Sequence, residues 1–269
     1  MSGTGTSYGC ISVINGIVNG TGAVIGIALR TVASYSEGGT AKDVIIEGES
    51  TDDTLARICV KRTLERIGAP DTGYQLRISS EIPPSRGLKS SSSVCNAVIK
   101  AVLCEHGEDM NTLDIIGLGV ECAKEAHVTV TGSFDDACGC EIGGFVKTYN
   151  YDNVILEQRP VRKDAVVLCI PGHVKTKVPK SEYEKRSGDM EQAIRMCDTD
   201  IYSAMTLNGR IIAEVTGESG DLIDIAIENG ALAAGVSGTG PAVAVICRHE
   251  DAQRIADAMP CETIITEVR

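Results

Sequence analysis

The chain has 269 residues, 43% of them hydrophobic, so it can bury a sizeable core in one large domain or two closely joined ones. Its formal net charge of −12 and its lack of Trp argue against a nucleic-acid-binding surface, which needs clustered Lys and Arg. There is no basic segment followed by an apolar run at the start, and no apolar stretch of bilayer length, so we expect a cytoplasmic protein that contacts no membrane.

The first part of the chain is rich in Val, Ile, Thr and Gly, and it predicts a β-meander over residues 10–36. Residues 50–68 place apolar side chains at helical spacing behind acidic residues, so we expect a helix that Ser50 or Thr51 caps. The stretch "GTGAVIG" from residue 20 comes close to a dinucleotide-binding fingerprint. Its spacing is wrong by one and strand-like sequence follows it, so we interpret its glycines as turns.

The remaining segments alternate between strand and helix patterns. Residues 127–144 are interpreted as a loop-rich, acid-bearing segment, and residues 181–215 as helical with breaks near Gly188 and Gly209. The other expected elements are helices over 90–106 and 111–126, strands over 74–81, 144–150, 153–159 and 165–171, a strand–glycine loop–strand unit over 231–247, a short helix and a last strand over 263–268. This order indicates an α+β protein that divides near residue 150, into 1–150 and 151–269.

The segment "IPPSRGLKSSSS" at residues 82–93 precedes a predicted helix. Helix starts carry free N–H groups and a partial positive charge, so they bind anions. Gly87 lets a phosphate approach the backbone, while Arg86 and Lys89 add charge. Four serines exceed what a helix cap needs, so we favour phosphate binding over a solvated cap. The loop is not a Walker A motif, because Leu88 stands where that motif needs a glycine.

Eleven cysteines are scattered singly, which is typical neither of a disulfide framework nor of a zinc site. We expect those that lie inside apolar runs to be small buried hydrophobes, namely Cys59, Cys95, Cys169 and Cys247.

Three motifs in chain order resemble the GHMP kinases, the superfamily of galactokinase, homoserine kinase, mevalonate kinase and phosphomevalonate kinase. The loop at Pro83–Ser91 is similar to their phosphate loop, except that Lys89 replaces the usual Gly or Ser. "TGSFDDACG" resembles the segment that carries their catalytic aspartate, and "GVSGTGPAV" (Gly235–Val243) resembles their C-terminal glycine loop. Within the superfamily, "GLKSSSS", "TGSFDDACGC" and "PGHVKT" are most similar to the archaeal-type shikimate kinases.

This resemblance implies a two-domain fold, with an N-terminal part like domain 2 of ribosomal protein S5 and a ferredoxin-like C-terminal part. It also implies an enzyme that uses ATP and Mg²⁺ to phosphorylate a small molecule, shikimate, with no nucleic acid or membrane partner and with a homodimer left open. The alternatives are a homoserine kinase and a non-catalytic nucleotide-binding protein.

The resemblance also implies roles for single residues. Asp135 would be the base that accepts the proton of the attacking hydroxyl, with Asp136 as the alternative, and Asp135 would also contact the substrate, as would Asn15. Mg²⁺ would be held by Ser91, in preference to Ser90, and by Glu125 or else Glu121. The predicted ATP-binding residues are Pro83, Pro84, Ser85, Arg86, Gly87, Leu88, Lys89, Ser90, Ser91, Ser92, Ser93, Gly235, Ser237, Gly238 and Gly240.

Two questions stay open in the sequence. The substrate carboxylate could be met by Arg30, Lys175 or Arg210, and residues 172–180 could form a mobile lid or a solvated basic loop. Several GHMP kinases use a lysine of the first strand to activate the nucleophile, but no lysine precedes Lys42 here, so such assistance is doubtful.

Overall fold

The computed structural model describes all residues except 1, 48–51, 130–131, 174–176 and 219, and it contains two β-sheets. The elements of the first half are β1 (Gly3–Ile14), β2 (Thr21–Glu37), β3 (Lys42–Ile46), α1 (Thr54–Ile67), β4 (Tyr74–Ser80), α2 (Ser90–His106), α3 (Thr112–Glu125), α4 (Phe134–Ile142), β5 (Phe145–Tyr149) and β6 (Val154–Arg159). Those of the second half are β7 (Ala165–Ile170), α5 (Lys180–Glu184), α6 (Ser187–Cys197), α7 (Ile201–Thr216), α8 (Gly220–Glu228), β8 (Ala233–Val236), β9 (Val243–Cys247), the 3-10 turn η1 (His249–Asp251), α9 (Ala252–Ala258) and β10 (Glu262–Glu267).

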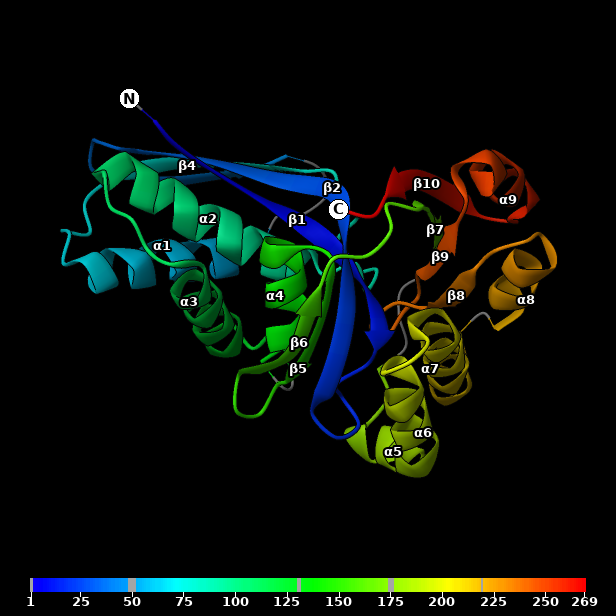
Figure 1. Ribbon diagram of the computed structural model, residues 1–269. Coiled ribbons are helices and arrows are strands. Elements are labelled where there is room, and N and C mark those ends of the chain that lie inside the picture. Colours follow the sequence, from blue (N-terminus) through cyan, green and yellow to red (C-terminus); the bar gives the residue numbers. More distant parts are fainter. Residues whose placement is uncertain (1, 48–51, 130–131, 174–176, 219) are drawn as a thin grey trace.

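The first sheet is organised around the long strand β2. Strand β1 pairs antiparallel along one edge of β2, and β4 and β5 pair with different halves of its other edge. Strand β3 lies parallel to β4, and helix α1 connects the two. Helices α1 to α4 gather on one side of this sheet, with α2 packed against β1 and β2 (Figure 1). The buried face of α2, which includes Val98, Ile99 and Val102, fills this core.

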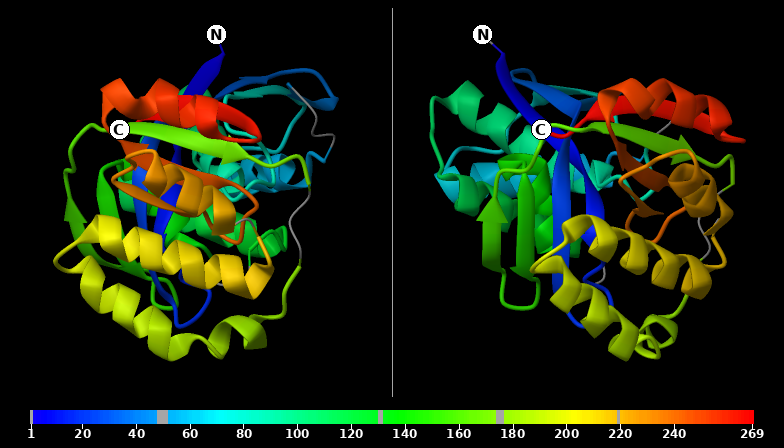
Figure 2. Two further views of the ribbon diagram at one scale, coloured as in Figure 1. Left: turned by 90° about the vertical axis from the view of Figure 1, so that its right-hand side faces the viewer. Right: turned by 45° about the vertical axis from the view of Figure 1, so that its right-hand side comes forward.

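The second sheet is antiparallel, with strand order β10-β7-β9-β8. Numbered in chain order, its strands lie in the order 4-1-3-2, which is the ferredoxin-like arrangement that the resemblance to the GHMP kinases implies. Helices α6 and α7 lie side by side, and α7 packs against β8 and also against β1 of the first half (Figure 2). The α+β fold with two sheet-based halves is therefore confirmed.

The two halves meet along several backbone hydrogen bonds. Val268 bridges to Ile27 of β2, and the N–H groups of Arg269 and Gly144 donate to the carbonyls of Gly26 and Arg269 at 3.0 and 2.8 Å. Strand β6 pairs with β5, so the predicted division at residue 150 falls within a hairpin of the first sheet. The sheets themselves divide between Arg159 and Ala165.

Several predicted elements need correction, and glycines account for most of them. The segment 127–144 contains helix α4, in which the buried Gly139 lies so close to β2 that a Cβ there would be 2.4 Å from Val24 Cγ2. Gly209 does not break a helix but lies inside α7, where a Cβ would come within 2.2 Å of Gly235 Cα. In "GTGAVIG" only Gly20 lies in the turn between β1 and β2, while Gly22 and Gly26 belong to β2. Strand β3 and helix α8 were not predicted.

Other expectations are confirmed or fall outside the described part of the chain. The predicted cap at Ser50 or Thr51 lies outside the described residues, and α1 has Asp53 at its N-cap position. All eleven cysteines are free, and Cys59, Cys95, Cys169 and Cys247 are buried as predicted. Within the described residues, no helix combines the length and apolarity that a membrane crossing needs.

Candidate active site

The predicted phosphate loop connects β4 to the start of α2. Lys89 occupies the N-cap position in the left-handed region, at φ 66°, and the N–H of Ser93 donates to its carbonyl at 3.1 Å. The N–H groups of Ser90, Ser91 and Ser92 therefore belong to the first turn of α2, and the helix contains no carbonyl that could accept from them. Ser90, Ser91 and Ser92 also line a large pocket, so hydroxyls and N–H groups together offer an anion site there.

The glycine loop of the second half holds the phosphate loop in place. Ser237 Oγ donates to the carbonyl of Gly87 at 2.9 Å, and the N–H of Ala242 donates to that of Arg86 at 3.1 Å. Gly87 has φ 82°, and a Cβ there would lie 2.1 Å from the carbonyl oxygen of Ser237. A side chain at position 87 is thus excluded by the contact between the two loops, a reason that the sequence did not reveal.

The guanidinium of Arg86 is hydrogen-bonded to backbone carbonyls and does not face the pocket. Its guanidinium donates to the carbonyl of Pro171 at 2.9 Å and to that of His173. His173 in turn contacts the buried carboxylate of Glu218, with 2.6 Å between Nε2 and Oε2. Arg86 therefore ties the phosphate loop to the segment after β7, and it does not line the pocket.

Asp135 lies in the first turn of α4 with only 5% of its surface exposed. Asn150 holds it twice: its Nδ2 donates to Asp135 Oδ1 at 2.8 Å, and its Oδ1 accepts from the Asp135 N–H at 3.0 Å. Gly22 of β2 makes room for the carboxylate, because a Cβ there would lie 2.2 Å from Asp135 Oδ2. Burial, followed by the charge of Asp136, raises the pKa of Asp135 to about 7.

Asp136, the neighbouring carboxylate, is paired. Its Oδ1 lies 2.9 Å from Lys89 Nζ, and both side chains are largely buried, with 15% and 8% of their surfaces exposed. Burial alone would lower the pKa of Lys89, but the charges of the two neighbouring carboxylates, Asp136 before Asp135, outweigh it and raise that pKa, so the ammonium stays charged. A buried ion pair therefore connects the phosphate loop to the helix that carries Asp135.

One pocket of about 1110 Å³ joins these groups. Its polar wall contains the phosphate loop, Asp135, Asp136, Asn150 and the glycine-loop residues Gly238 and Thr239. Its apolar wall is lined by Ile46, Leu55, Ile78, Ile82 and Val128. The volume exceeds the range of about 300–1,000 Å³ typical of a site for one small ligand, so the pocket has room for two.

The structure does not bring Glu125 or Glu121 into this pocket. Their carboxylates lie 3.6 and 3.4 Å from Arg62 on the outer face of α3, and Glu125 has 44% of its side-chain surface exposed. The predicted metal ligand thus belongs to an exposed ion-pair network between α1 and α3. Among the described residues, no three acidic, His or Cys side chains form a metal-binding cluster.

Other predicted residues also have structural partners. Asn15 lines the pocket, but its Nδ2 donates to the carbonyl of Gly238 at 2.6 Å and its Oδ1 accepts from Ile17 N–H, so it holds the glycine loop. Gly235 packs against α7 and is not a lining residue. Neither candidate for the substrate carboxylate that can be described lines the pocket: Arg30 pairs with Glu81, and Arg210 with Asp224. Lys175 lies outside the described residues, as does part of the segment 172–180, for which the sequence left a lid and a solvated loop open.

Sequence reasoning missed several residues of this site. Asn150, directly after β5, and Gly22 of β2 position Asp135, and Ser12 Oγ accepts from the Gly238 N–H at 3.0 Å. All three contacts join residues far apart in the chain, and no local spacing marks them. The one available signal was Gly22 inside a strand, since a strand glycine often marks a close approach.

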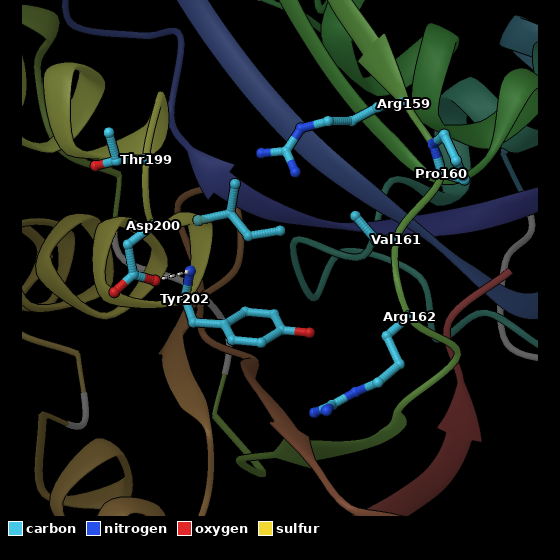
Figure 3. Close-up of a pocket in the computed structure, with 8 residues that line it drawn as sticks. Arg159, Pro160, Val161, Arg162, Thr199, Asp200 and Tyr202 are labelled. Atoms are coloured by element: carbon cyan, nitrogen blue, oxygen red, sulfur yellow. Dashed lines mark hydrogen bonds between the residues drawn. The ribbon is translucent and has the colours of Figure 1, made fainter.

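A second, smaller pocket of about 350 Å³ lies where the chain passes between the sheets (Figure 3). Its arginines already have partners, because Arg159 pairs with Glu157 and Arg162 with Asp164, while Asp200 caps α7. It shares no lining residue with the larger pocket.

Comparison with known proteins agrees with this geometry. Residues 54–144 match the family model of the GHMP kinase N-terminal domain, and residues 190–265 match that of the GHMP kinase C-terminal domain. The chain belongs to the GHMP kinases and is an ATP-dependent kinase. It is similar to the shikimate kinase of Methanothrix thermoacetophila, with 36% identity over 91% of this chain and 85% of the relative. The shikimate kinase of Pyrococcus abyssi is 34% identical over 90% of each chain.

Solved structures confirm the fold. The mevalonate kinase of Methanococcus jannaschii superposes with a TM-score of 0.78 over 100% of this chain and 98% of its own, at 18% identity. A homoserine kinase from Cytophaga hutchinsonii gives a TM-score of 0.72 at 18% identity, over 99% and 94% of the two chains. At this identity the likeness concerns the fold alone.

Proposed function

We propose that this protein transfers the γ-phosphoryl group of ATP to a hydroxyl of shikimate, forming shikimate 3-phosphate in aromatic amino-acid (chorismate) biosynthesis. The observation that carries the proposal is the buried carboxylate of Asp135, which lines the same pocket as the serine-rich start of α2. A phosphate site and a candidate base in one cavity are what an alcohol kinase needs. The identities with archaeal shikimate kinases supply the choice of acceptor.

The pocket divides naturally between the two substrates. The phosphates of ATP would lie against the N–H groups and hydroxyls of Ser90, Ser91 and Ser92, and the flat base against the apolar wall. The acceptor, which carries several hydroxyls, would lie at the polar end near Asp135 and Thr239. This arrangement excludes water from the reacting oxygens and fixes their approach, which is the main contribution of the protein in phosphoryl transfer.

Asp135 is suited to accept the proton of the attacking hydroxyl. Because its pKa is about 7, a substantial fraction is ionised near neutral pH, and the ionised form is a stronger base than an ordinary aspartate. Asn150 holds its orientation, so Oδ2 is the oxygen that remains for the acceptor. Asp136 is the weaker candidate, since Lys89 engages it.

We also propose that Mg²⁺ takes part, held mainly by the phosphates of ATP. The site offers serine hydroxyls and few carboxylates, a donor set that fits a hard cation arriving with the nucleotide but not a cage made by protein alone. Among the serines we prefer Ser91 as the protein ligand of Mg²⁺, because Ser91 is exposed at the start of α2. When bound, the metal neutralises charge on the transferred group.

The cytoplasm is the proposed site of action, supported by eleven free cysteines, which are typical of a reducing compartment. The sequence left a homodimer open, and light scattering coupled to size-exclusion chromatography measures the oligomeric state.

The test is a screen of ATP consumption with shikimate, homoserine, mevalonate and galactose. We expect turnover with shikimate alone. Turnover with homoserine instead would show that the protein is a homoserine kinase. Tight ATP binding without turnover of any acceptor would indicate a non-catalytic nucleotide-binding protein.

A further inference from the structure

Lys89 stands at the meeting point of three segments of the active site. It caps α2, its Nζ lies 2.9 Å from Asp136 of α4, and a Cβ on Gly238 of the glycine loop would lie 3.1 Å from that same Nζ. Its carbonyl accepts from Cys140 Sγ at 3.8 Å. Among the described residues that line the large pocket, Lys89 is also the only basic one.

The backbone at position 89 indicates that this side chain is needed. A φ of 66° is adopted without strain by glycine but is unfavourable for a lysine, so interactions in the fold, those of this side chain among them, offset the strain. The interaction on view is the ion pair with Asp136. Turning Lys89 toward a phosphate would leave Asp136 largely buried without a partner, which is strongly unfavourable.

We infer that Lys89 is a positioning residue for catalysis, which neutralises Asp136 so that Asp135 alone acts on the acceptor hydroxyl. This inference rests on the proposed function, in which Asp135 is the base. The first basic residue of the chain is Arg30, so strand β1 carries no cation that could serve instead. Lys89 of the phosphate loop supplies a cation to the site instead.

The electrostatic reason follows from the two adjacent carboxylates. The charge of Asp136 raises the pKa of Asp135, whereas that of Lys89 lowers it. Without the Lys89 ammonium, nothing would offset the negative charge of Asp136, which would raise the pKa of Asp135 further and keep its carboxyl protonated at neutral pH. The other titratable groups around the pair are the thiols of Cys10, Cys138 and Cys140, and burial raises the pKa of Cys10 and Cys138, so these two stay neutral.

Three variants test this role through the direction of a pH shift. In Lys89→Met, the rising limb of kcat against pH should move to higher pH by at least about one unit, with KM for ATP little changed. In Asp136→Asn, the limb should move to lower pH. In the double variant, which removes both charges, it should return close to the wild-type position. If Lys89 bound a phosphate of ATP instead, Lys89→Met would raise KM for ATP, and adding Asp136→Asn would not lower that KM again.

The titration of Asp135 can also be followed without turnover. Protein labelled with ¹³C at the aspartate carboxyl carbons shows the pKa of Asp135 directly, with the signal assigned by its loss in Asp135→Asn. We expect this pKa to rise in Lys89→Met and to return in the double variant. If shikimate is not a substrate, the proposed function is wrong, but this titration still tests whether Lys89 lowers the pKa of Asp135. An unchanged Asp135 pKa in folded Lys89→Met, or a double variant that keeps the shift, would overturn the inference. If Lys89→Met does not fold, the double variant is compared with Asp136→Asn, and equal pKa values would overturn it as well.

Discussion

The substitution Gly22→Ala gives a sharp test of how Asp135 is positioned. The added methyl carbon would lie 2.2 Å from Asp135 Oδ2, 2.5 Å from its Cγ and 2.8 Å from its Cβ. A carbon–oxygen contact needs about 3.3 Å, so the carboxylate must move by about 1 Å. Gly22 lies in a regular part of β2, opposite Thr148, where alanine fits the backbone, so the collision with Asp135 is the main effect.

A displacement of this size should lower kcat by about 100-fold, which corresponds to about 2.7 kcal/mol in the activation barrier. The phosphate loop is not touched, so KM for ATP should stay close to that of the wild type. Steady-state kinetics with shikimate and ATP measure both constants, and thermal unfolding shows whether the fold persists.

The matched control is Gly117→Ala in α3, where an added Cβ meets no atom within 4 Å. This variant should keep the wild-type kcat. Combining Gly22→Ala with Asp135→Asn should cost little beyond the Asp135→Asn change, because both act on the same carboxylate. Wild-type kcat in a folded Gly22→Ala protein would refute the reasoning, since Asp135 would then not work from the position described.

Further predictions concern the same pocket. Asp135→Asn should retain ATP binding and lower kcat by about 10² to 10⁴, whereas Asp136→Asn should do much less at its own pH optimum; reversed effects in a kinetic comparison would make Asp136 the base. Because the folded pKa of Asp135, about 7, lies above the ordinary 3.8, the neutral carboxyl stabilises the fold at low pH and this contribution is lost as the pH rises through 7. Asp135→Asn should therefore melt at a higher temperature than the wild type at about pH 8 and at a similar one near pH 4, as calorimetry can show. Gly87→Val would drive a side chain into the carbonyl of Ser237, so ATP affinity in titration calorimetry should fall at least about tenfold; unchanged binding would contradict this. EDTA should abolish turnover and added Mg²⁺ should restore it, and full activity in EDTA would remove the metal from the mechanism.

Much of the site could be predicted because its parts have local signatures. Three segments are recognisable from short stretches of sequence: a serine-rich loop before a helix, an acidic pair after a glycine, and a strand–glycine loop–strand unit. The structure places residues from all three in one pocket. Helix α4 was missed because Gly132 and Gly139 suggested a loop. Gly139 is in fact required where the helix touches Val24 of β2, a contact that only the folded chain shows.

For a related reason, the sequence did not show that the predicted metal ligand, Glu125, lies away from the pocket. Glu121 and Glu125 lie one turn apart on α3, but spacing cannot tell which way that face of the helix points. In the fold both carboxylates lie beside Arg62 of α1, far away in the sequence, on the exposed side of α3. The departure at Lys89 was visible in the sequence, yet its partner Asp136 could not be inferred without the fold.

The return of Val268 and Arg269 to strand β2 has a consequence for how the molecule unfolds. Arg269 is hydrogen-bonded to Gly26 and Gly144 of the first half, Val268 forms a β-bridge with Ile27, and the Arg269 guanidinium lies 4.0 Å from the centre of the Tyr8 ring. Opening either sheet alone would break these contacts, so we expect the two halves to unfold as one cooperative unit and not to open separately. The active-site pocket, whose walls come from both halves, is then lost in a single step when the protein melts.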